Sequence, residues 1–192
     1  MRHSGWESVI QWAVWFTIMG LVMARLGRAR LKPRPPSEAG TLAHPPSTLA
    51  IGAATTLLFG AIALITAAYG KTRADDLAFA IFAGLALLGL PLIAEYYHAR
   101  HSVSPAGLEY GSLTGARGSM SWADVTHLRY ANTLKWFRIE DAQGNVARLS
   151  IMLTGLPEFA AQALQHVPPH AMDAPTRAVL ERTAAGNPPP VW

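Results

Sequence analysis

The sequence lacks cysteine, and its two longest apolar runs lack charged residues. Without cysteine there is no disulfide, no thiol nucleophile, no iron–sulfur cluster and no thiolate zinc site. The two runs, 47–70 and 77–94, contain no Asp, Glu, Lys or Arg. Because ion and proton pathways usually need ionisable groups within the membrane, this lack argues against a transporter or pump acting alone.

The signatures of common catalytic sites are also missing. The sequence has no Gly-x-Ser-x-Gly elbow and no glycine-rich phosphate loop, so nucleophilic and nucleotide chemistry have no recognisable site. Adjacent carboxylates occur at Asp75-Asp76 and Glu140-Asp141, where turns are expected. We therefore expect no catalytic residue, no enzyme activity and no cofactor.

The composition favours a membrane protein. Of the 192 residues, 51% are apolar and only 15% are charged, which lies on the membrane side of ordinary globular usage. The net charge is +4, and five of the sixteen Lys and Arg residues lie within 25–34. They stand beside an apolar helix without interleaved aromatic residues, so we expect the lipid bilayer as a partner and no nucleic acid.

The two uncharged runs predict a transmembrane hairpin over residues 47–98. Each run reaches the ~18–20 residues that a helix needs to cross ~30 Å of hydrocarbon, and a chain of this length cannot bury both in a soluble core. Small residues recur every four positions, which predicts close packing within the hairpin. They are Gly52, Thr56 and Gly60 on the first helix and Ala80 and Gly84 on the second.

A further uncharged run, 8–24, predicts a first spanning helix within an N-terminal segment 1–30. A signal peptide and an interfacial helix are the alternatives. The basic residues that follow can hold anionic lipid headgroups or can simply fix the topology. These headgroup candidates are Arg25, Arg28, Arg30, Lys32 and Arg34. The positive-inside rule places them, and the C-terminal domain, in the cytoplasm.

The rest of the chain divides into a proline-rich cytoplasmic linker (31–46), a β domain (99–168) and a flexible tail with a short helix (169–192). Period-two alternation in the β domain predicts about six antiparallel strands in a small barrel or sandwich, closed by an amphipathic helix after residue 155. The residues expected in its core are Met120, Trp122, Leu128, Tyr130, Phe137, Ile139, Leu149, Ile151, Phe159 and Leu164.

The order of these elements resembles the bacterial PH-like domain proteins of the membrane-anchored type, over residues 47–167. The resemblance rests on a Pro-Ala-Gly-Leu turn at 105–108, a Gly-Ser-Met-Ser-Trp-Ala-Asp-Val stretch at 118–125 and Leu-Pro-Glu-Phe at 156–159. It implies a PH-like fold that serves protein interaction. A full PH fold has seven strands, and phosphoinositide-binding members carry Lys or Arg at the first turn, which here, at 104–107, has neither.

Glu95, His98 and His101 are spaced three residues apart and are the weak candidates for a metal site. The alternative is that these histidines simply lie at the membrane boundary.

Together these features predict a non-enzymatic, multi-pass protein of the bacterial inner membrane with a cytoplasmic PH-like domain for protein interaction, self-association or scaffolding. The alternative is an auxiliary membrane subunit of a transporter, secretion or envelope complex.

Overall fold

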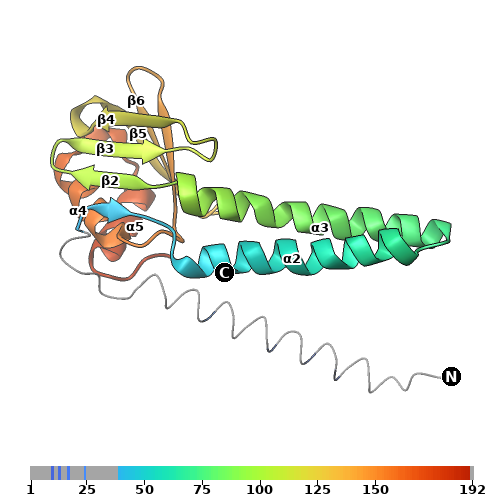
Figure 1. The fold of residues 1–192 in the computed structure, drawn as a ribbon. Coiled ribbons are helices and arrows are strands. Elements are labelled where there is room, and N and C mark those ends of the chain that lie inside the picture. The colour runs from blue at the N-terminus through green and yellow to red at the C-terminus, as the bar shows by residue number, and fades with distance from the viewer. Residues whose placement is uncertain (1–9, 11–12, 14–16, 18–23, 25–38, 191–192) are drawn as a thin grey trace.

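The computed structural model describes residues 10, 13, 17, 24 and 39–190. In this part of the chain a β domain lies at one end of a long helical hairpin (Figure 1). The hairpin consists of α2 (Pro46–Tyr69) and α3 (Arg73–His98). The first spanning helix expected over 8–24 lies outside the described residues, apart from four helical positions.

Both hairpin helices are long and apolar enough to cross a membrane. With 24 and 26 residues they extend about 36 and 39 Å at the helical rise of ~1.5 Å per residue. Only 17% and 11% of the residues in their most apolar stretches are buried within the protein, so these are not core helices of a soluble domain. The described residues thus hold two candidate spans and not three.

The backbones of the two hairpin helices are in close contact near the domain, at Gly52 of α2 and Gly89 of α3. A Cβ atom on Gly52 would lie 2.9 Å from the Gly89 carbonyl oxygen, closer than real Cβ contacts. Beside this contact the Thr56 hydroxyl donates a hydrogen bond of 3.2 Å to the Ala86 carbonyl. Small residues here let the two backbones touch.

The other small residues predicted for this interface do not make such contacts. A Cβ atom on Gly60 would meet nothing nearer than the Ala86 side chain at 4.0 Å, and one on Gly84 would meet nothing within 4 Å. Ala80 is exposed. The prediction was wrong at Gly84 because four-residue spacing marks a face of one helix but does not give the register between two helices.

The β domain contains two small antiparallel sheets. The first has the strand order β1 (Thr41–Leu42), β2 (His101–Ser104), β3 (Gly107–Gly111) and β4 (Arg117–Ser121). The second has the order β5 (Val125–Ala131), β6 (Trp136–Asp141) and β7 (Val146–Ser150). A single 3-10 turn, η2 (Trp122–Asp124), connects β4 to β5. The described residues therefore form two sheets and not the closed barrel that was one of the expectations.

Strand β1 comes from the segment for which the sequence predicts only a linker. Thr41 pairs with Ser102 and Leu42 with His101, and the Ala43 carbonyl accepts a 2.9 Å hydrogen bond from Thr154 N–H. Residues 41–43 thus belong to the β domain. A two-residue strand in a segment with five prolines leaves no alternation to detect, which explains why the sequence predicts only a linker over 31–46.

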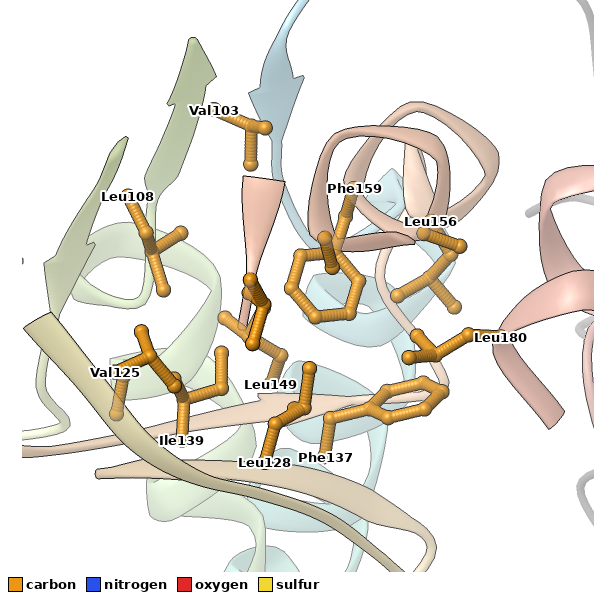
Figure 2. Close-up of a cluster of buried hydrophobic side chains, with 14 of the residues drawn as sticks. Val103, Leu108, Val125, Leu128, Phe137, Ile139, Leu149, Leu156, Phe159 and Leu180 are labelled. Carbon is orange, nitrogen blue, oxygen red and sulfur yellow. The ribbon is translucent and has the colours of Figure 1, made fainter. Parts of the chain in front are cut away.

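The core of the domain lies between the sheets and two helices, α4 (Leu156–His166) and α5 (Ala174–Ala184). Figure 2 shows Phe159 of α4 and Leu180 of α5 near Phe137 of β6. Of the ten residues expected in the core, eight are buried, while Tyr130 and Leu164 are partly buried against it. Trp122 is 2% exposed, and its indole N–H donates a 2.8 Å hydrogen bond to the Ser104 carbonyl.

Helix α5 is the short helix predicted within the tail 169–192, and it packs into the core of the β domain. Its Leu180 is fully buried, and its Thr176 hydroxyl accepts a 3.0 Å hydrogen bond from the Tyr130 N–H of β5. The helix packs through two threonines, Thr176 and Thr183, as well as through apolar residues. Because half of its buried face is polar, a hydrophobic periodicity does not reveal that it belongs to the core.

Candidate functional site

The two ends of the hairpin enter the domain side by side, because the strands that flank it, β1 and β2, are paired. His44 lies just before α2 and is buried, with its Nε2 atom 3.7 Å from Oε2 of Glu95 near the end of α3. His101 of β2 is 4% exposed, and its Nδ1 atom accepts a 3.3 Å hydrogen bond from the Gly111 N–H. These side chains form the junction between hairpin and domain.

Both junction histidines are neutral at physiological pH. Burial lowers the pKa of His44 to about 4. Burial, and secondarily the nearby His44, lowers the pKa of His101 to about 4. The contact between His44 and Glu95 is therefore polar packing and not an ion pair at pH 7.

The predicted metal candidates do not form a metal site. Glu95 faces His44, the His101 Nδ1 atom is engaged by the backbone, and His98 is exposed. Across the described residues no group of three His, Cys, Asp or Glu side chains is placed to hold a metal ion. His44, which the sequence gave no reason to single out, replaces His98 beside Glu95 because β1 brings it there.

One carboxylate of each adjacent pair has a structural role. Asp75 accepts hydrogen bonds of 2.9 Å from the Lys71 and Thr72 N–H groups and so caps the start of α3. Asp141 accepts bonds of 3.0 and 2.8 Å from the Gln143 and Asn145 N–H groups and closes the turn between β6 and β7. Carboxylates that cap turns in this way are not paired for acid–base catalysis.

The predicted headgroup candidates, Arg25 to Arg34, lie outside the described residues. Two other arginines flank a cleft of about 450 Å³ on the four-stranded sheet, Arg100 two residues after the end of α3 and Arg117 at the start of β4. Ser102 and Ser119 also line it. Guanidinium and hydroxyl groups are suited to anions, although the Glu109 carboxylate, which accepts a 2.8 Å bond from Ser102, occupies part of the cleft.

The three-stranded sheet carries three arginines at one level. Arg129 of β5 is paired with Arg138 of β6, which in turn is paired with Arg148 of β7. All three side chains are exposed. Since paired residues on neighbouring strands share a face, the three guanidinium groups project from the outer face of the sheet, opposite the core. We call Arg129, Arg138 and Arg148 the arginine row.

The neighbours of the arginine row only partly balance its charge. The Arg138 guanidinium donates a 2.9 Å hydrogen bond to the Glu140 carboxylate. The Arg148 guanidinium carbon lies 5.7 Å from the centre of the Trp136 ring, within the range of a cation–π interaction. Beside Arg129 and Arg138 the surface has a hollow of about 200 Å³, which His127 and Glu140 also line.

Sequence reasoning missed the arginine row. Each arginine stands between buried or partly buried residues of its strand, so alternation alone indicates that each is exposed. Their alignment depends on the register of two hairpins, which the sequence does not give: the turn between β5 and β6 contains a non-glycine residue, Lys135, at φ 54°. Comparisons with protein-family models, with curated proteins and with solved structures found no match to this chain.

Proposed function

We propose that this chain is a non-enzymatic protein of the bacterial inner membrane that holds a PH-like domain at the cytoplasmic surface to bind another protein. The observation that carries the proposal is the insertion of the hairpin between two paired strands, β1 and β2. A domain connected through both of these strands has little freedom to reorient on its anchor. Such a two-strand connection suits a scaffold protein that must present a defined face of its domain to a partner.

The packing of the core also restricts how the β domain can move relative to the hairpin. Leu42 of β1 is 1% exposed and belongs to the same buried cluster as Leu108 of β3 and Phe159 of α4. Only residues 43–45 separate Leu42 from the start of α2 at Pro46, so the domain cannot move far from α2 without pulling this leucine out of the core. A single flexible linker would carry no such cost.

The strand count supports the PH-like assignment. Strands β2 to β7 supply six, and β1 adds a seventh from before the hairpin, which is the number that a full PH fold has. The turn between β2 and β3 lacks the basic residues of phosphoinositide-binding members. Protein interaction is thus the better-supported role.

The proposed orientation of the hairpin in the membrane is based on the distribution of charged residues at its two ends. At the turn of the hairpin, Lys71 and Arg73 are offset by Asp75 and Asp76, whereas the five cations of 25–34 and Arg100 flank the other ends of α2 and α3. The positive-inside rule then puts the domain in the cytoplasm.

The test is a version of the protein without the hairpin, with Ala43 joined to Arg100 through Asn-Gly. Since Leu42 and His101 are paired, a two-residue turn can close the two strands. Circular dichroism checks folding, and co-purification in mild detergent compares this version with the full chain. Retention of a partner by the folded, hairpin-free domain supports the proposal. Retention by the full chain alone contradicts it and favours the auxiliary membrane subunit, whose partner contacts the helices.

A further inference from the structure

The arginine row is an unusual arrangement within a sheet. Like charges placed directly opposite on neighbouring strands destabilise the pair, and here two such pairs share the central Arg138. Of the three arginines, Arg138 has a carboxylate partner in Glu140. The Asp173 carboxylate also interacts electrostatically with Arg129, so the three arginines have two acidic neighbours. The row therefore keeps one positive charge in excess, which leaves it able to bind an anion.

We propose that the arginine row binds an acidic segment of a partner protein, with one carboxylate at Arg129 and another at Arg148. This inference rests on the proposed function and names the surface and the chemistry of the partner. Guanidinium groups bind carboxylates through two parallel hydrogen bonds. The hollow beside Arg129 has the room for such a group, at about 200 Å³.

The spacing of the row sets the spacing of the acidic residues. Neighbouring strands lie ~4.8 Å apart, so the backbones at Arg129 and Arg148 are ~10 Å apart across two intervals. A peptide in the polyproline II conformation advances ~3.1 Å per residue with three residues per turn. Two acidic residues three positions apart then lie on the same side of the peptide, ~9 Å from each other, which matches this distance. Trp136, partly exposed beside Arg148, offers an aromatic contact for an apolar residue between them.

Other polyanions fit this surface less well. Glu140 lies within the face and would repel a continuous chain of phosphates, and Trp136 is the aromatic residue packed against the row in the described structure. Single-stranded nucleic acid usually needs several stacking residues. The hairpin leaves from the four-stranded sheet, beside Arg100 and Arg117, whereas the row lies on the other sheet, so lipid headgroups at the base of the hairpin have nearer cations than the row.

The experiment measures peptide binding to the full chain in nanodiscs of zwitterionic lipid. The probe is a fluorescein-labelled octapeptide with two glutamates three residues apart and a phenylalanine between them, followed by fluorescence anisotropy. The control peptide has glutamines in their place. We expect binding of the glutamate peptide alone, weakened at least tenfold between 50 mM and 500 mM salt because the contacts are electrostatic.

Variants locate the site. Arg129→Gln and Arg148→Gln should each weaken binding about tenfold, and the double variant should abolish it. Arg182→Gln on α5, exposed and outside the row, makes the same change in net charge as either single variant. Its affinity for the glutamate peptide should stay within twofold of that of the unmodified chain. Circular dichroism controls for folding. Equal affinity for the glutamine peptide, unchanged binding by the double variant, or an equal loss in Arg182→Gln would overturn the proposal.

Two further outcomes are decisive. Tighter binding of a labelled 12-nucleotide single strand than of the glutamate peptide would overturn the choice of a protein partner. If the row variants bind the peptide as well as the unmodified chain does, while the hairpin-free domain still retains its partner, the assignment of the row is overturned and the proposed function stands.

Discussion

Replacing Leu42 by Ala tests whether β1 belongs to the β domain. The leucine is 1% exposed and lies in the main core cluster, although it stands before the hairpin and more than fifty residues from β2. Truncation removes three buried carbon atoms and leaves a cavity. Leu→Ala changes at such positions cost about 2–5 kcal/mol in the free energy of unfolding. We expect about 3 kcal/mol, since a two-residue strand can partly adjust.

The assay is urea unfolding of the full chain in mild detergent, followed by near-ultraviolet circular dichroism. Leu134→Ala is the matched control, because this leucine of the β5–β6 turn is 59% exposed and its truncation should change the free energy of unfolding by less than about 0.5 kcal/mol. Equal effects of the two substitutions would refute the reasoning and return residues 39–46 to a linker.

Three other predictions follow from the hairpin, the core and the junction. Gly89→Leu should destabilise the hairpin in detergent by about 1–3 kcal/mol because it collides with α2, whereas Gly84→Leu should not; equal thermal stability of the two would place Gly89 toward lipid. Trp122→Ala should cost about 3–5 kcal/mol and largely unfold the hairpin-free domain by circular dichroism; a folded variant would contradict its role in the core. His44 and His101 stay neutral in the folded protein down to about pH 4 but take up protons near pH 6.5 when unfolded. The free energy of unfolding therefore has its full value above pH 6.5. This free energy should fall by up to ~1.4 kcal/mol per pH unit for each histidine as the pH drops toward 4. A free energy of unfolding by urea that does not change between pH 6.5 and pH 4 would contradict the prediction.

The sequence was most informative where one element has one clear pattern. Uncharged runs indicated both hairpin helices, and strict alternation indicated strands β2 to β7 and residues such as Phe137 and Ile139, which are fully buried. Each of these patterns depends only on local periodicity. Fold class and core could therefore be predicted in part.

What the sequence could not provide was the alignment of one element against another. The contact of Gly52 with Gly89 and the arginine row both depend on register. Strand β1 is too short to show a period, and it pairs with a strand on the far side of the hairpin. The candidate binding surface was missed for this reason, since each of its arginines alone resembles an ordinary exposed charge.

The central claim is that the hairpin crosses a membrane with the β domain on the cytoplasmic side. Because the chain has no cysteine, single cysteines can be placed at two exposed positions, Lys71→Cys in the hairpin turn and Gln143→Cys in the β6–β7 turn. Bacterial spheroplasts are treated with a membrane-impermeant maleimide before and after lysis. We predict that the cysteine at 71 is labelled in intact spheroplasts and the cysteine at 143 only after lysis. Labelling of both in intact spheroplasts, or of the cysteine at 143 alone, would contradict the account.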